Sequence, residues 1–146
     1  MKNRGIVGLK DSGTFNHLKS CLEIARDTDF RILAGKESFI LKGLKLGSVG
    51  AASALANIFT EKLVSLYRSF SDGKLEETQK IQESLSPLID SFLNLNDFVT
   101  AIEISLKLMG ICDFYSTHPF GNISASEKSK ISELLRKEEL LKEEEE

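Results

Sequence analysis

The fold is decided by the stretch Gly5-Ile6-Val7-Gly8-Leu9-Lys10-Asp11-Ser12. Its apolar residues predict a short buried strand that ends in Lys10, and the polar residues after it predict a turn. Burial disfavours the charged form of a lysine, and a neutral amine can attack a carbonyl carbon to form a Schiff base. The alternative is a strand-end lysine whose ammonium reaches solvent. The stretch alone leaves both interpretations open.

Strand and helix patterns alternate outward from this stretch as far as Gly73. The hydrophobic spacing predicts strands at 6–10, 31–34 and 49–54, and helices at about 15–26, 39–44 and 57–70. Polar residues 11–14 supply N-cap chemistry for the first helix, and Gly47 is expected to end the second. Strands that alternate with amphipathic helices at this spacing are typical of parallel βαβ units.

After Gly73 the pattern is helical only. It predicts a long helix over about 75–92 that Pro87 should kink, and a second helix that begins at Asp97. Ser124 and Glu127 have the spacing of a capping box ahead of a last helix. We therefore divide the chain into βα units over residues 1–73 and a helical extension over residues 74–146.

Composition excludes several classes of protein. The chain has 146 residues and a net charge of −3, so no excess of positive charge indicates a nucleic-acid partner. No apolar stretch approaches the roughly 20 residues that span a bilayer, and no signal-peptide pattern follows Met1. The two cysteines, Cys21 and Cys112, fit no metal or redox spacing. We expect a cytoplasmic protein with no membrane partner and with Cys21 in its core.

Three motifs, in this order, resemble the dihydrodipicolinate synthase / N-acetylneuraminate lyase family of class I aldolases. The first is Gly8-Leu9-Lys10-Asp11-Ser12, which is similar to the family's Schiff-base strand. The second is Phe30-Arg31-Ile32-Leu33-Ala34-Gly35-Lys36-Glu37, which is similar to the next strand with its glycine. The third is Leu46-Gly47-Ser48-Val49-Gly50-Ala51-Ala52-Ser53-Ala54-Leu55-Ala56-Asn57, which resembles the eighth strand.

The resemblance implies an α/β fold that comprises the last three βα units of a (β/α)8 TIM barrel, followed by a C-terminal helical extension. A complete barrel takes about 250 residues, so strands one to five lie outside this sequence. In the family that half carries a Gly-Thr-Thr-Gly-Glu-like loop, which binds the substrate carboxylate, and a tyrosine that shuttles protons. Neither motif occurs here. Activity is therefore expected to need the amino-terminal half.

The resemblance also implies a site. Lys10 is the expected catalytic residue, which attacks the ketone of pyruvate or another 2-oxo acid without a cofactor or metal. Gly35 is expected to give a close backbone approach beside the bound pyruvate, and Ala52 to offer a backbone carbonyl. Glu37 stands where relatives recognise the distal end of the substrate, but it is equally well placed as a helix N-terminal acid. Ser53 is a further candidate, with small-residue packing as its alternative.

Three further polar residues are given no catalytic role. Asp11 is expected to be a turn and cap residue, and His17 and His118 are expected to be surface groups.

Two hypotheses about function remain open. The first is a Schiff-base aldolase or lyase subunit, similar to aldolases of 2-keto-3-deoxy sugar acids or 4-hydroxy-2-oxoglutarate, or to the synthase. The second is a non-catalytic half-barrel that self-associates or serves as a scaffold, because open sheet edges favour association. The expected partners are a 2-oxo acid and either the missing amino-terminal half or a second copy of the chain, in a homo-oligomer.

Overall fold

A computed structural model describes residues 5–113 and 119–141 of the chain. His118 therefore lies outside the described residues. The chain forms two compact units, Met1–Ser86 and Pro87–Glu146. The end of the strand–helix alternation, which we used to divide the chain at residues 73 and 74, falls inside the first unit.

The first unit contains a three-stranded parallel sheet. Its strands are β1 (Gly8–Asp11), β2 (Arg31–Ala34) and β3 (Gly50–Ala51), in the order β1-β2-β3. Lys10 pairs with Leu33, and Leu33 pairs with Gly50, so these three residues form one row across the sheet. Parallel strands joined through helices confirm the expected βαβ arrangement.

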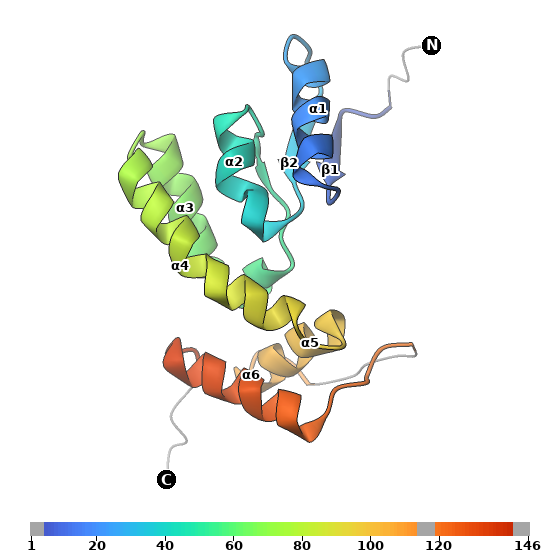
Figure 1. Ribbon diagram of the computed structural model, residues 1–146, viewed down its shortest axis with the longest axis vertical. Helices are drawn as coiled ribbons and strands as arrows, with labels where there is room; N and C mark the ends of the chain where they lie inside the picture. Colours follow the sequence, from blue (N-terminus) through green and yellow to red (C-terminus); the bar gives the residue numbers. More distant parts are fainter. Residues whose placement is uncertain (1–4, 114–118, 142–146) are drawn as a thin grey trace. The chain divides into compact units, whose positions relative to one another are not determined.

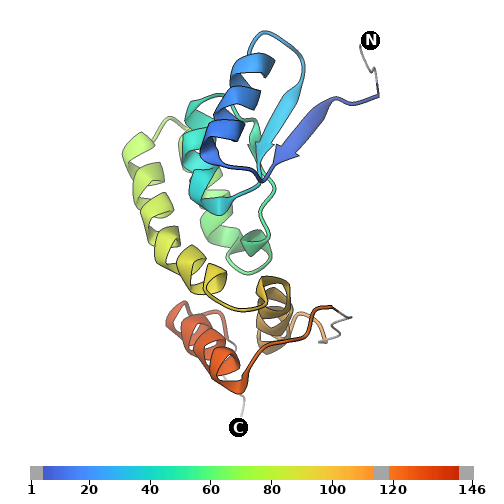
Figure 2. The ribbon, with the colours of Figure 1, turned by 45° about the vertical axis from the view of Figure 1, so that its right-hand side comes forward.

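Helices cover one face of this sheet. Figures 1 and 2 show α1 (Phe15–Ala25) and α2 (Ile40–Lys45) on the same side of the strands. The core on that side consists of Leu18 and Leu22 from α1 and of Ile32 and Ala34 from β2, with Cys21 packed against it. The first unit also contains two 3₁₀ turns, Glu37–Phe39 and Leu55–Asn57, and α3 (Thr60–Ser71).

The caps that end and begin these helices follow the predicted chemistry. Thr14 is the N-cap of α1, and its hydroxyl accepts from the N–H of His17 at 3.3 Å. Gly47 and Gly73 follow α2 and α3 with φ angles of +103° and +76°, a left-handed conformation that glycine adopts without steric cost. The turn residues therefore define where each helix stops.

Two strand predictions were wrong in detail. β1 was expected over 6–10 and buried, but it spans Gly8–Asp11, and Leu9 and Lys10 are exposed. Lys10 lies on the open face, which no further strand covers among the described residues, whereas Leu9 pairs with Ile32 and lies on the helix face of an edge strand. β3 was expected over 49–54, but only Gly50 and Ala51 have strand geometry. The small residues after Ala51 enter a turn, and α3 accordingly begins at Thr60.

A long helix, α4 (Leu75–Leu93), continues through Pro87 and leads into the second unit. That unit also contains α5 (Phe98–Leu108) and α6 (Ala125–Lys137). None of the helices in residues 5–113 and 119–141 combines the length and the apolar character that crossing a bilayer requires.

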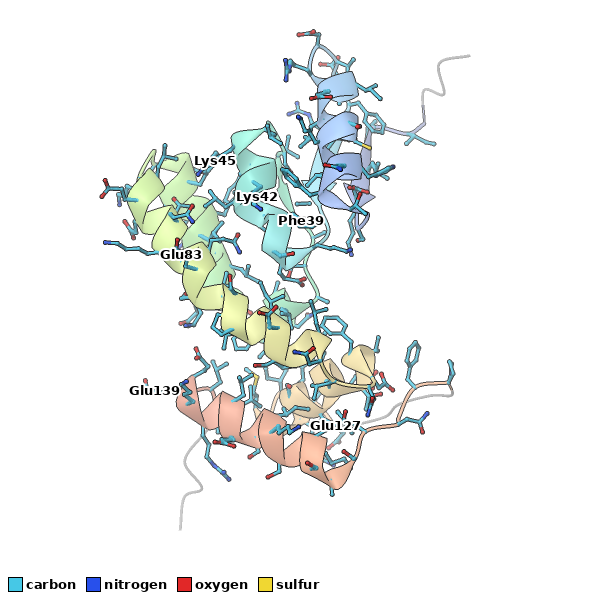
Figure 3. The ribbon with its side chains drawn as sticks, viewed as in Figure 1. Phe39, Lys42, Lys45, Glu83, Glu127 and Glu139 are labelled. Atoms are coloured by element: carbon cyan, nitrogen blue, oxygen red, sulfur yellow. The ribbon has the colours of Figure 1, made fainter. Side chains whose placement is uncertain are left out.

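Two carboxylates connect the helices of the second unit. Glu127, on α6 (Figure 3), completes the predicted capping box with Ser124 and also accepts from the N–H of Asn96 at 2.9 Å. Asp97 is the N-cap of α5, and its Oδ2 accepts from the N–H of Gly121 at 2.9 Å. Glu127 therefore links α6 to the residue before the N-cap of α5. Asp97 links the N-cap of α5 to the segment that precedes α6.

The same contacts lower the pKa values of both acids. The Asn96 N–H, followed by the hydroxyl and N–H of Ser124, lowers the pKa of Glu127 from 4.5 to about 2. The hydroxyl of Thr100, followed by its N–H, lowers the pKa of Asp97 below its ordinary value. Hydrogen bonds to the charged form favour ionisation, so both acids stabilise the unit when they are ionised.

We expect the second unit to lose stability as the pH falls from about 4.5 to about 2. A depressed carboxyl pKa contributes stability above its unfolded value, and that contribution disappears as the folded form takes up a proton. Urea unfolding at pH 7, 4.5 and 2.5 measures the free energy of unfolding. This free energy should fall more steeply with decreasing pH in the wild type than in Glu127→Gln. Parallel declines for the two proteins would contradict this account.

Candidate active site at the carboxyl ends of the strands

Lys10 lies on the face of the sheet opposite to the helices. Ile32 and Ala34 are buried against α1, and alternation along the strand places Leu33 on the other face. Lys10 is paired with Leu33 and therefore shares that face. Its side chain is exposed. Within this chain, Lys10 is therefore a strand-end lysine whose ammonium reaches solvent, which was the alternative interpretation. Lys10 lies one residue before the carboxyl end of β1, whereas the sequence predicted that the strand ends at Lys10.

Backbone hydrogen bonds hold the tips of the three strands together. The N–H of Gly35 donates to the carbonyl of Asp11 at 2.7 Å, which joins the tips of β2 and β1. The N–H of Ala52 donates to the carbonyl of Ala34 at 2.9 Å, which joins β3 to β2. Lys10, Gly35 and Ala52 therefore lie at one end of the sheet, on three neighbouring strands.

Gly35 has a steric reason to be glycine. A Cβ atom there would collide with Ser12 Oγ and would lie 2.8 Å from the carbonyl oxygen of Asp11. The close backbone approach expected at Gly35 is therefore made to the tip of β1. This packing role requires no ligand.

We expect Gly35→Ala to destabilise the first unit by about 2 kcal/mol, because the added methyl group forces the tips of β1 and β2 apart. Urea unfolding of the single variant and of Gly35→Ala/Ser12→Gly measures this cost. The double variant should recover part of the loss, since it removes the hydroxyl but leaves the clash with Asp11. A single variant as stable as the wild type would contradict the packing argument.

Glu37 and Ser53 are joined directly. Ser53 Oγ donates to Glu37 Oε1 at 2.7 Å, and the N–H of Leu55 donates to the same oxygen at 3.2 Å. Glu37 is only 7% exposed. Both predicted residues are thus present at the strand tips, where their polar groups bond to each other. The expected helix N-terminal position of Glu37 is also correct, because it is the first residue of the 3₁₀ turn Glu37–Phe39.

Asp11 was predicted to be a turn and cap residue, and it also bonds to a side chain of α1. Its Oδ1 accepts from the N–H of Gly13 at 3.1 Å and lies 2.8 Å from Nδ1 of His17. Its Oδ2 is buried with no hydrogen-bond partner among the described residues. His17 is exposed, as expected, but the sequence did not indicate its bond to Asp11. The spacing Asp11-x-x-x-x-x-His17 across a strand–turn–helix could have suggested it.

An apolar groove lies beside β3 and α3. Its volume is about 520 Å³. It is lined by Leu33, Ile40, Val49, Gly50, Ala51, Ser53, Ala56, Thr60, Leu63, Val64, Tyr67 and Arg68. Its lining includes Leu33, the register partner of Lys10. Over residues 5–113 and 119–141, no three His, Cys, Asp or Glu side chains gather in a way that could hold a metal ion.

These features define a class of protein: an α/β protein with a parallel sheet built from βαβ units and with polar residues gathered where the strands end. Residues 1–138 match the model of the dihydrodipicolinate synthetase family. The chain belongs to this family, and its relatives in the comparison include synthases and a protein named as a probable aldolase.

The curated relatives are about twice as long as this chain. A 4-hydroxy-tetrahydrodipicolinate synthase of Archaeoglobus fulgidus is 30% identical over 139 residues, which cover 93% of this chain and 47% of the relative. A probable 2-dehydro-3-deoxy-D-pentonate aldolase of Escherichia coli is 27% identical over 145 residues, covering 97% and 48%. The chain therefore spans about half the length of these relatives.

Solved structures agree on the fold. Dihydrodipicolinate synthase from Bacteroides thetaiotaomicron has a TM-score of 0.83 and 28% identity, over 92% of this chain and 47% of that chain. N-acetylneuraminate lyase from Fusobacterium nucleatum has a TM-score of 0.78 and 29% identity, over 96% and 47%. The three strands and their helices thus match half of the family's TIM barrel.

Proposed function

We propose that this chain supplies the Schiff-base lysine of a class I aldolase or lyase that acts on pyruvate and related 2-oxo acids. The observation that carries the proposal is the position of Lys10, near the carboxyl end of a parallel strand and on the open face of the sheet. In TIM barrels, active sites lie at that end of the strands. The three strands would be strands six to eight of the barrel, and α4–α6 would form the C-terminal helical extension.

The chemistry begins at Lys10 Nζ. The neutral amine attacks the C2 carbonyl carbon of the 2-oxo acid, and loss of water from the adduct leaves an iminium. In the cleavage direction, the hydroxyl at C4 gives its proton to a base, which the amino-terminal half would supply. The electron pair of the breaking C3–C4 bond moves into the iminium, which becomes an enamine, and the other fragment leaves as an aldehyde. Protonation of the enamine carbon and hydrolysis then release pyruvate and regenerate the amine.

This reaction requires a cover over the open face. An exposed lysine is protonated and is a poor nucleophile, whereas burial disfavours the ammonium. We propose that the strands missing from this sequence provide that cover, since the chain spans about 47% of the relatives. The groove beside β3 would receive the first of those strands, because β3 is an edge strand of the sheet and the groove is apolar.

The substrate class is supported by the names of the relatives. One solved N-acetylneuraminate lyase, from Fusobacterium nucleatum, is described as complexed with pyruvate and is 27% identical to this chain. The Escherichia coli relative is named for a 2-dehydro-3-deoxy sugar acid. We extend the shared part of these substrates, a 2-oxo acid, to this chain.

A second candidate function is self-association without catalysis. Ile6, Val7 and Leu9 are 59%, 74% and 40% exposed along the segment that forms the outer strand of the sheet. Exposed apolar residues on an edge strand favour pairing with another chain. Sedimentation of the chain alone distinguishes a monomer from a second-copy assembly.

The proposed function is tested by trapping. Pyruvate and sodium borohydride are added to the chain together with the amino-terminal segment of a relative, and the modified peptide is located by mass spectrometry. An adduct on Lys10 supports the aldolase. An assembled complex without an adduct would leave the self-associating or scaffold function.

A further inference from the structure

One oxygen of the Glu37 carboxylate is already occupied by protein groups. Its Oε1 accepts two hydrogen bonds, from Ser53 Oγ at 2.7 Å and from the N–H of Leu55 at 3.2 Å. Glu37 is 7% exposed and Leu55 is 1% exposed. Oε1 therefore has both of its acceptor sites engaged by protein groups at an almost fully buried position.

A side chain from α4 holds the backbone of Glu37. Gln82 Nε2 donates to the carbonyl of Glu37 at 3.2 Å. Gln82 Oε1 accepts from the N–H of Leu41 at 3.1 Å. One amide therefore connects α4 to the first residue of the 3₁₀ turn and to the first turn of α2, and all of these residues lie in the first unit.

Together these bonds form a chain of contacts from α4 to the tip of β3. Gln82 fixes the turn at residues 37–41, and Glu37 in turn fixes Ser53 and Leu55. The segment between Ala51 and α3 has little regular structure of its own, apart from the 3₁₀ turn Leu55–Asn57. The Glu37 carboxylate supplies two of the hydrogen bonds that hold this segment.

We propose that Glu37 is a positioning residue, which holds the loop after β3 in place, and that Gln82 is the anchor that orients Glu37. The inference deepens the proposed function and rests on it in one respect, because it assigns that loop to the substrate site. It gives Glu37 a role other than recognition of the distal end of the substrate.

A positioning role and a substrate-binding role of Glu37 predict different effects of Glu37→Gln. A positioning role needs an acceptor oxygen, which Glu37→Gln retains and Glu37→Leu removes. A role in binding substrate through a negative charge is lost in both variants. Loss of the acceptor leaves the buried N–H of Leu55 without a partner, which is costly.

Hydrogen exchange of the Leu55 amide tests the positioning role in the chain alone, without substrate. We expect Glu37→Leu to accelerate this exchange about tenfold or more, and Glu37→Gln to stay within about threefold of the wild type. Glu61→Leu, which changes an exposed acid in the first turn of α3, is the matched control and should leave exchange unchanged. Unchanged exchange at Leu55 in Glu37→Leu would overturn the proposal.

Gln82→Leu keeps the test decisive if Glu37→Leu does not fold. We expect faster exchange at Leu41, whose N–H loses its acceptor, and a smaller acceleration at Leu55 through the released turn. Acceleration at Leu41 with none at Leu55 would overturn the anchoring role of Gln82.

The assembled enzyme provides a second readout. If Glu37 positions the loop, Glu37→Gln should keep both kcat and KM for the 2-oxo acid substrate close to wild type, while Glu37→Leu should raise KM. A raised KM in Glu37→Gln, with normal exchange at Leu55, would identify a substrate contact and overturn the proposal. Absence of any Lys10 adduct in the wild type would reject the proposed function, and the exchange data would still decide the role of Glu37.

Discussion

Mixing this chain with the amino-terminal segment of a relative is expected to give a stable one-to-one complex. The segment to use is the part of the Archaeoglobus fulgidus synthase that lies outside its match to this chain, roughly half of that protein. The sheet here has three strands and a TIM barrel has eight, so copies of this chain alone cannot add up to one complete barrel. Size-exclusion chromatography with light scattering measures the complex.

The groove beside β3 should be the surface that contacts the amino-terminal segment in this complex. Val64 is 39% exposed and lines the groove, so Val64→Glu would bury an unpaired carboxylate in the complex. We expect at least about hundredfold weaker association, since burying an uncompensated charge costs several kcal/mol. Ser65→Glu is the control, because Ser65 is the exposed next residue of α3 and does not line the groove.

Equal weakening by Val64→Glu and Ser65→Glu would contradict the assignment of the groove. If the chain forms dimers alone and does not bind the amino-terminal segment, the result would instead favour self-association through its edge strands. Sedimentation of the chain with and without the segment separates these results.

Replacement of Lys10 in the assembled complex is expected to have the largest effect on activity. Lys10→Arg keeps the positive charge but cannot form a Schiff base, because the guanidinium stays protonated. We expect kcat/KM for cleavage of a 2-keto-3-deoxy sugar acid to fall about 10⁴-fold or more, as for other residues that carry the covalent step. Lys10→Ala should fall by a similar factor.

Lys45→Ala serves as the control for this loss. Lys45 is an exposed lysine on α2 (Figure 3), and the control should keep wild-type activity. A Lys10→Arg complex that retains a tenth or more of wild-type turnover would contradict the Schiff-base role of Lys10.

The local elements of this fold could be predicted from the sequence because their signals are local. The bounds of β2, the N-cap at Asp97 and the capping box of Ser124 and Glu127 all follow from neighbouring residues, and the structure has each of them. β3 was predicted too long, because small residues such as Ala52 and Ala54 fit both a strand and a turn. The segment after β3 is bonded to Glu37, which lies 18 residues before Leu55.

The site was harder to predict because its contacts join distant parts of the chain. Lys10, Gly35, Ala52 and Ser53 could be assigned to strand tips, since parallel strands align their carboxyl ends. The hydrogen bonds of Gln82 to Leu41 and Glu37 span 41 and 45 residues, and no local sequence pattern indicates them. Exposure of Lys10 could not be predicted from its own strand either, because residues 6–10 do not show what lies over the open face of the sheet.

The central claim is that Lys10 forms the Schiff base, and borohydride trapping with pyruvate tests it most directly. The account predicts that the complex with the amino-terminal segment gains the mass of one reduced pyruvate adduct, and that peptide mapping assigns it to Lys10. It also predicts no such gain in Lys10→Arg. An adduct on another lysine, or none in a complex that has assembled, would contradict the account.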